Sequence, residues 1–187
     1  MNNKSSYKRI LGVIVSVIFV FSGVISALVM YYDPFFHYHA PSEGGKYIFD
    51  NEVYQNPGIA RKFDYDSVIV GSSMTRPLSP SKFDEQYDCK SVQMPFSGGS
   101  VKNASINVEQ AFHHKGSLKY VFWGIDPYGI AMGVDETKID LPTYIYDDNP
   151  LNDLAYLLNK EVVKKYMMII SMVHKSYMMR CGMMRQM

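Results

Sequence analysis

An uninterrupted apolar run near the start of the chain constrains the fold more than any other feature. Residues 10–30 carry no charged side chain, and serine is their only polar residue type. About 20 apolar residues in a helix cross the hydrocarbon core of a bilayer. Lys4, Lys8 and Arg9 precede the run, and cations on a flank stay on the cytoplasmic side. We therefore expect a cytoplasmic tail at 1–9, a transmembrane anchor at 10–30 and an extracytoplasmic remainder.

A cleaved signal peptide is the alternative explanation of this run. The apolar core of a signal peptide is usually shorter, roughly 7–15 residues, and it ends in a small-residue cleavage site. The sequence Ile25-Ser26-Ala27 matches such a site poorly. We therefore favour an uncleaved anchor, which makes this a single-pass protein of the cell membrane with bilayer lipid as its first partner.

Composition restricts the other partners and the cofactors. The 187 residues carry a formal net charge of +1, which gives no argument for nucleic-acid binding. Cys89 and Cys181 are too few for a disulfide framework and have no metal-ligand spacing. His37 and His39 lie among aromatic residues just after the anchor and lack a third ligand. Because a zinc site needs three or four ligands, we interpret them as interfacial polar side chains and expect no metal or cofactor.

The strongest strand signal in the chain is Ser-Val-Ile-Val at 67–70. Its β-branched residues leave no polar face, which is typical of a parallel strand covered on both sides. Gly71 permits a sharp exit from the strand, and Ser72 and Ser73 follow it. Ligands bind at the carboxyl ends of strands in open α/β sheets. We therefore expect a functional site at this turn.

Two later strands are expected to end in comparable turns. Residues 91–96 precede the sequence Ser-Gly-Gly-Ser, which contains Gly98 and Gly99. Residues 118–125 are rich in aromatic and β-branched side chains, and they lead into Asp126 and a proline. Each strand thus ends in a glycine-containing turn.

Helical segments separate these strands. Residues 77–87 fit a short helix, and 101–113 fit a longer one that Ser100 caps. This alternation predicts an α/β domain with a largely parallel sheet. Because parallel strands end at the same edge, the three turns meet there and Asp126 is expected near Ser73.

The segments on either side of this alternation are less regular. Residues 31–66 have the turn signals of an approach segment, with a short helix at 51–61. Residues 128–150 fit a loop with a short extended piece at 144–146. The apolar spacing over 151–165 predicts one further helix.

The domain predicted at 67–165 is followed by a methionine-rich tail at 166–187. Residues 167–187 hold eight of the thirteen methionines and no acidic residue, and they show no clear period. A core helix and an adaptable binding surface are two explanations. We favour a third, in which the tail is a truncated or out-of-frame end that is foreign to the fold.

The serine turn has the residue types of a nucleophilic site. Ser73 is the candidate nucleophile, with Ser72 second. Backbone N–H groups of this turn and of Gly98 or Gly99 are candidate oxyanion donors, since glycine lets a substrate oxygen approach the backbone. Gly98 and Gly99 also suit a phosphate at a helix start, but no P-loop lysine or G-x-G-x-x-G pattern accompanies them.

A general base for this nucleophile is not evident. His113 and His114 are expected at the far end of a helix that starts near the site, roughly 20 Å away at 1.5 Å per residue. His174 belongs to the tail. A plain strand-to-helix turn, whose hydroxyls satisfy local backbone donors, is therefore the structural alternative for residues 71–73.

At the three turns the chain resembles the SGNH/GDSL hydrolase superfamily, particularly its membrane-anchored branch associated with bacterial cell-surface polysaccharides. Residues 68–73, Val-Ile-Val-Gly-Ser-Ser, match the first block with serine in place of aspartate, and the family's nucleophile falls on Ser73. The oxyanion glycine of the second block falls on Gly98 or Gly99. In the third block Asp126 replaces the oxyanion asparagine.

The resemblance implies a three-layer α/β/α sandwich, here incomplete, because the fourth motif, Asp-x-x-His, does not occur. It implies a serine esterase or O-acyltransferase that acts, in full length, on carbohydrate esters of the cell envelope. Without the histidine we expect this chain to be inactive. The alternative is a non-catalytic, membrane-tethered glycan-binding or assembly protein in envelope polysaccharide biosynthesis, with Asp126 and Ser72 at the edge of its cleft.

Overall fold

The computed structural model describes residues 3–41, 47, 49–131, 133 and 135–180, with backbone only for 3–6 and 173–180. The chain divides into two compact units. One unit is Phe35–Asp148, and the other joins Met1–Pro34 to Asn149–Met187. The units are described separately below.

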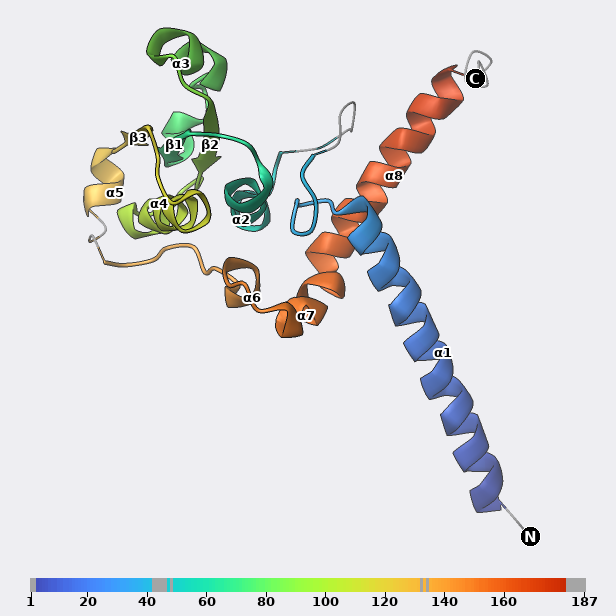
Figure 1. Cartoon of the computed structure of the whole chain (residues 1–187). Helices are drawn as coiled ribbons and strands as arrows, with labels where there is room; N and C mark the ends of the chain where they lie inside the picture. Colours follow the sequence, from blue (N-terminus) through green and yellow to red (C-terminus); the bar gives the residue numbers. More distant parts are fainter. Residues whose placement is uncertain (1–2, 42–46, 48, 132, 134, 181–187) are drawn as a thin grey trace. The chain divides into compact units, whose positions relative to one another are not determined.

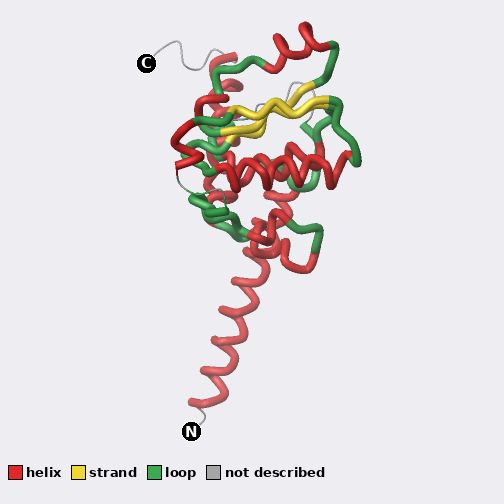
Figure 2. The backbone as a smooth tube through the Cα atoms, turned by 90° about the vertical axis from the view of Figure 1, so that its left-hand side faces the viewer, coloured by secondary structure: helices red, strands yellow, loops and turns green. Residues whose placement is uncertain are grey.

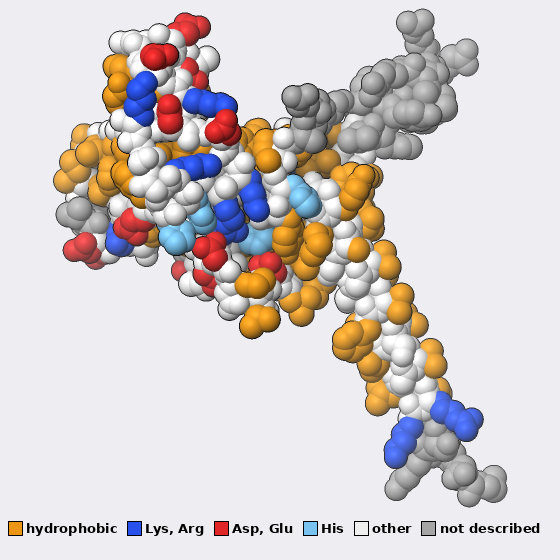
Figure 3. Space-filling model, in the orientation of Figure 1, with side chains coloured by type: hydrophobic (Ala, Val, Ile, Leu, Met, Phe, Trp, Pro, Cys, Tyr) orange, Lys and Arg blue, Asp and Glu red, His pale blue; other side chains and the backbone are white. Residues whose placement is uncertain are grey.

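Helix α1 (Asn3–Tyr32) forms the predicted apolar helix. Its segment Tyr7–Tyr32 is 26 residues long, and the mean hydropathy of its most apolar 18-residue stretch is 2.7. The segment is therefore long and apolar enough to cross a membrane. Hydrophobic side chains are exposed along this helix, and cationic side chains lie near its N-terminal end (Figure 3). The predicted apolar helix is therefore confirmed.

The single helix predicted over 151–165 is wrong, because the chain breaks there. It forms η2 (Pro150–Asn152) and α7 (Asp153–Leu157), and then α8 (Lys160–Arg180). The Asn159 side chain causes the restart, since its oxygen accepts the N–H of Glu161 at 2.8 Å and so caps α8.

Helix α8 carries the methionine-rich tail as far as Arg180. Its residues Val162, Tyr166 and Ile169 are buried at helical spacing, and the Tyr166 ring lies 5.3 Å from that of Tyr32. Met167 and Met168 are exposed. The first part of the tail is thus helical, whereas residues 181–187, which include Cys181, lie outside the described residues.

The Phe35–Asp148 unit is built on a small parallel sheet (Figures 1 and 2). Its strands are β1 (Ser67–Gly71), β2 (Ser91–Pro95) and β3 (Tyr120–Gly124), in the order β2-β1-β3. Both pairings are parallel. The predicted strands and their direction are confirmed, with β1 buried at the centre as its lack of a polar face indicated.

Helices cover both faces of this sheet. On one face, Val68 and Val70 pack in a core with residues of α2 (Glu52–Lys62) and α4 (Val101–Lys115). On the other face, Phe122 packs against α3 (Pro80–Tyr87), and the centroids of the Phe122 and Phe83 rings lie 4.3 Å apart. The chain steps from β1 to β2 and then back past β1 to β3. Right-handed crossovers in opposite directions place their helices on opposite faces.

Side-chain caps mark where two of these helices begin, and one of them, at Ser100, was predicted. Ser100 and Asn103 form a reciprocal capping box at the start of α4, and Gly116 follows its end with a φ of +74°. Asn51 accepts the Tyr54 N–H at the start of α2. Ser79 precedes Pro80 at the start of α3, but its side chain makes no capping bond. The helices predicted at these three places are confirmed to within a few residues.

The segment predicted as a loop at 128–150 contains two short helices, α5 (Pro127–Ala131) and α6 (Thr143–Tyr146). The extended piece expected at 144–146 is therefore wrong. One helical turn buries Ile145 and lets the Tyr146 hydroxyl donate to the Val53 carbonyl at 2.9 Å. In a strand, the side chains of residues 145 and 146 would point to opposite faces and could not both make these contacts.

Gly58 of α2 lies where the helix packs closely against the backbone of Phe35 and Phe36, so a substitution there tests this packing. A Cβ at this position would overlap the Phe35 carbonyl oxygen and lie 2.9 Å from that of Phe36. We expect Gly58→Ala to destabilise the unit by about 1–3 kcal/mol despite the better helix propensity of alanine. The thermal midpoint, followed by fluorescence of the sole tryptophan, Trp123, measures this change.

The matched control is Gly23→Ala, since Gly23 is also helical and has no atom within 4 Å of an added Cβ. It should leave the Trp123 transition where it is. A Gly58→Ala protein as stable as the parent would contradict the packing described for α2.

Candidate functional site

The carboxyl ends of the strands meet at a shallow hollow, as predicted. It is lined by Gly71 at the end of β1 and Ser72 after it, by Gly99 just before α4, and by Asp126 after β3. Strands β1 and β3 are neighbours whose flanking crossovers lie on opposite faces, which is the switch point where open α/β sheets bind ligands. The cavity volume is about 10 Å³, room for about one water molecule.

Gly71 sets how closely the two strands approach at this hollow. Its φ is +149°, and a Cβ would lie 2.6 Å from both the Gly124 carbonyl oxygen and the Thr75 methyl carbon. A side chain at Gly124 would also overlap that methyl group. The two glycines therefore let the strand tips and the serine turn close on one another.

The serine turn presents its two hydroxyls differently. Ser72 caps the short helix η1 (Ser73–Thr75), its oxygen accepting the Met74 N–H at 3.2 Å, and its hydroxyl lies on the side of Asp126, where it lowers the pKa of that carboxyl. Ser73 is exposed and does not line the hollow. The expected approach of Asp126 to the turn is thus made through Ser72, whereas Ser73 faces solvent beside it.

Asp126 is held as an ionised group. The Ser72 hydroxyl, and after it the backbone N–H of Gly129 at 2.7 Å, hold the pKa of this carboxyl below its usual value. A carboxylate in this state accepts hydrogen bonds and carries negative charge. It therefore does not suit the role of an oxyanion donor.

The two glycines of the second turn also differ. Gly99 lines the hollow, but its N–H donates to the Phe96 carbonyl at 2.9 Å. Gly98 is exposed with a φ of +71°, and an added Cβ there would meet open space. Of the two candidate oxyanion donors, Gly98 is therefore the one whose N–H is not committed to that tight turn.

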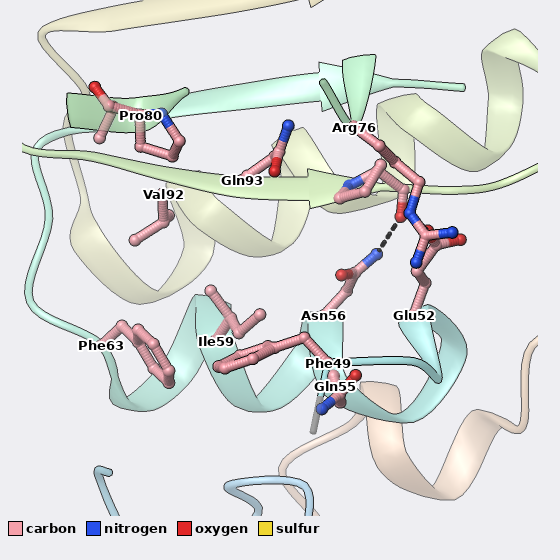
Figure 4. Close-up of a pocket in the computed structure, with 12 residues that line it drawn as sticks. Phe49, Glu52, Gln55, Asn56, Ile59, Phe63, Arg76, Pro80, Val92 and Gln93 are labelled. Atoms are coloured by element: carbon pink, nitrogen blue, oxygen red, sulfur yellow. Dashed lines mark hydrogen bonds and ion pairs between the residues drawn. The ribbon is translucent and has the colours of Figure 1, made fainter. Parts of the chain in front are cut away.

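Glu52, at the start of α2, joins the serine turn to the glycine turn, and the sequence analysis missed it. Its carboxylate accepts the Ser97 N–H at 2.5 Å and the Ser97 hydroxyl at 2.9 Å, and it lies 3.0 Å from Nε of Arg76. Figure 4 shows Glu52 and Arg76 directed toward one another. An acidic residue in a first helical turn is common, so nothing local in the sequence indicates this bridge.

We expect Glu52→Gln to loosen both turns. The amide keeps the shape but loses the charge that strengthens three contacts, which predicts a loss of about 1–3 kcal/mol in unfolding free energy. Chemical denaturation followed at Trp123 measures it. Glu85→Gln is the matched control because Glu85 is exposed on α3, and equal effects of the two changes would argue against the bridge.

A histidine cluster lies at the other end of α4. The His113 ring nitrogen is 2.9 Å from Asp148, and ligand atoms of His113, His114 and Asp148 lie within 4.8 Å of one another. These residue types suit zinc, but Nε of Arg61 lies 3.6 Å from the same carboxylate and its charge opposes a cation. We therefore describe this cluster as an ion-paired group.

No histidine with a described side chain lines the hollow. The length of α4, 15 residues, places the cluster roughly 20 Å from it at 1.5 Å per residue. His37 instead lies with its Nδ1 3.3 Å from Arg61, and His39 is exposed. The described part of the chain thus brings the predicted serine, glycine and aspartate turns together without a base.

The burial of His114 makes the unit sensitive to mild acid. Burial, and after it the charge of Arg61, hold the pKa of His114 below its usual value of 6.5. The unfolded chain binds this proton more readily, so the stability is present above about pH 6.5 and is lost as pH falls below it. We expect the thermal midpoint, read at Trp123, to fall between about pH 7.5 and about pH 5.5.

His114→Gln should flatten this pH dependence, whereas His39→Gln, at an exposed position, should leave it steep. An unchanged slope in His114→Gln would assign the acid sensitivity to another group.

Comparisons with protein-family models, with curated proteins and with solved structures find no match to this chain. The geometry of the three turns therefore carries the functional argument.

Proposed function

We propose that this chain belongs to a membrane-anchored, SGNH-like protein of the cell envelope that hydrolyses or transfers acyl esters of carbohydrate. The observation that carries the proposal is the meeting of the serine, glycine and aspartate turns at the switch point of a parallel sheet. The apolar helix α1 supplies the anchor. The cations Lys8 and Arg9 at its start favour a cytoplasmic N-terminus and an extracytoplasmic Phe35–Asp148 unit.

In the proposed reaction, the Ser73 hydroxyl attacks the acyl carbon of an ester. A base takes its proton and passes it to the sugar oxygen as the ester C–O bond breaks, which leaves an acyl-serine. Water or a second sugar hydroxyl then takes the acyl group, and its proton returns to the serine oxygen through the base. The N–H groups of the serine turn and of Gly98 are the proposed oxyanion donors. Ser72 acts as a positioning residue, because it accepts the Met74 N–H and the Thr75 hydroxyl and so fixes the turn that carries Ser73, with Asp126 beside it.

Because no described histidine reaches this site, we expect the purified chain to show no ester hydrolysis. Imidazole added to the solution can replace a missing base, which contributes roughly 10²–10⁴-fold in enzymes. We expect imidazole to raise labelling of Ser73 by a fluorophosphonate at least tenfold. Mass spectrometry of the labelled peptide identifies the modified serine.

Ser73→Ala should abolish this labelling, and Ser81→Ala, at an exposed serine of α3, is the control that should retain it. Labelling that is no faster than that of an unstructured serine peptide would remove the nucleophile assignment. Ester hydrolysis by the untreated chain that is lost in Ser73→Ala would instead overturn the expected inactivity.

A non-catalytic glycan-binding role is the second candidate. The ionised Asp126 and the committed Gly99 N–H favour it, because both depart from an oxyanion site. Carboxylates accept hydrogen bonds from hydroxyl groups. Binding of envelope polysaccharide that persists in Ser73→Ala but is lost in Asp126→Asn would support this role over the catalytic one.

A further inference from the structure

A second and larger cavity lies along the outer edge of β2, away from the hollow at the strand tips (Figure 4). Its volume is about 480 Å³, within the range of sites that enclose a small molecule. The walls come from α2 on one side and from the start of α3 on the other, with β2 between them. We call this cavity the β2 groove.

The hydrogen bonds of β2 show which backbone groups face the β2 groove. The carbonyl of Lys90 accepts from Ser67, and the N–H of Phe96 donates to Gly71, so both point toward β1. Backbone groups of successive strand residues point to opposite edges. Ser91, Gln93 and Pro95 therefore direct their backbone groups away from β1.

The two ends of this outward edge are already occupied. The Ser91 N–H donates to the Asp84 carboxylate at 2.7 Å. Pro95 has no N–H, and its carbonyl accepts from the Asn56 side chain at 2.8 Å. Between them, Gln93 lines the β2 groove and presents one N–H and one carbonyl to it. The edge is thus closed to a long added strand but open to a single amide pair.

The walls of the β2 groove are mainly apolar around this amide pair. Phe49, Ile59, Phe63 and Val92 line it, and Figure 4 shows Val92, Ile59 and Phe63 gathered at one end. At the other end Glu52 and Arg76 neutralise each other. The groove therefore suits an uncharged ligand with an apolar group next to a secondary amide.

We propose that the β2 groove binds a short, uncharged peptide segment in extended conformation. One peptide residue pairs antiparallel with Gln93, its N–H donating to the Gln93 carbonyl and its carbonyl accepting the Gln93 N–H. The next peptide residue directs its side chain to the opposite face of β2, where an apolar group packs among Ile59, Phe63 and Val92. Main-chain bonds at a sheet edge combined with a side-chain pocket are a recurrent mode of peptide recognition. This site is separate from the serine turn and does not depend on the proposed reaction.

The test uses the full chain, labelled with nitrogen-15, in detergent micelles. N-acetyl-Ala-Leu-Ala-amide is the probe, and the backbone amide signal of Gln93 is the readout. We expect that signal to shift in a saturable way. The same peptide with an N-methyl group on the nitrogen of its first alanine, the residue that pairs with Gln93, lacks one donor and is no less apolar. We therefore expect it to bind at least tenfold more weakly.

Phe49→Ala should weaken binding several-fold, because it removes one wall of the groove without burying a defect, Phe49 being 55% exposed. Phe112→Ala is the matched control, since Phe112 is 45% exposed on α4 and does not line the groove. Ser73→Ala should bind the peptide as the parent does, which separates this proposal from the proposed function.

Equal affinity for the two peptides, or equal effects of Phe49→Ala and Phe112→Ala, would overturn the proposal. Stronger binding of N,N′-diacetylchitobiose than of the peptide would do the same and would assign the β2 groove to an acetylated sugar.

Discussion

The close approach of β1 and β3 at Gly71 and Gly124 is the contact on which the candidate site depends. It leaves no room for a Cβ at either position, and the Thr75 methyl group fills the space above them. Thr75 also donates to the Ser72 carbonyl at 2.8 Å, so the same contact fixes the serine turn. A bulkier residue at either tip would separate Ser72 from Asp126 and open the hollow.

Long-range ties hold the turns from the other side. Glu52 lies 45 residues before Ser97 in the chain, yet its carboxylate is shared between Ser97 and Arg76. The Gln93 side chain donates to the Thr75 and Leu78 carbonyls and so tethers the end of the serine turn to β2. These polar ties connect the two candidate loops through groups that lie outside the hollow itself.

The elements that the sequence predicted correctly are those with strong local signals. The β-branched run of β1, the Ser100 cap and Gly116 place a strand and a helix without help from the rest of the chain. The strand predicted at 144–146 was wrong because the aromatic and β-branched composition of these residues favours a strand, whereas burial of Ile145 and the hydrogen bond to Val53 favour a helical turn.

The break between α7 and α8 has a similar cause, since the Asn159 cap outweighs the continuous apolar spacing. At the site, the convergence of the turns followed from parallel topology. The sequence did not predict which of the two serines lies beside Asp126, because neighbouring residues on a tight turn have the same composition and differ only in where their side chains point. The link through Glu52 joins distant parts of the chain and leaves no pattern in the sequence.

The two edges of the sheet have different consequences for how the protein behaves in concentrated solution. β2 is protected by Pro95 and by the Asp84 carboxylate, which occupies its first N–H. The other edge, β3, reads Tyr-Val-Phe-Trp-Gly, with no proline and no charge, and Tyr120 and Val121 are each more than one third exposed. Uncovered strands of this composition pair with other chains. Aggregation of the Phe35–Asp148 unit would therefore begin at β3, and Val121→Lys would suppress it at little cost to the core.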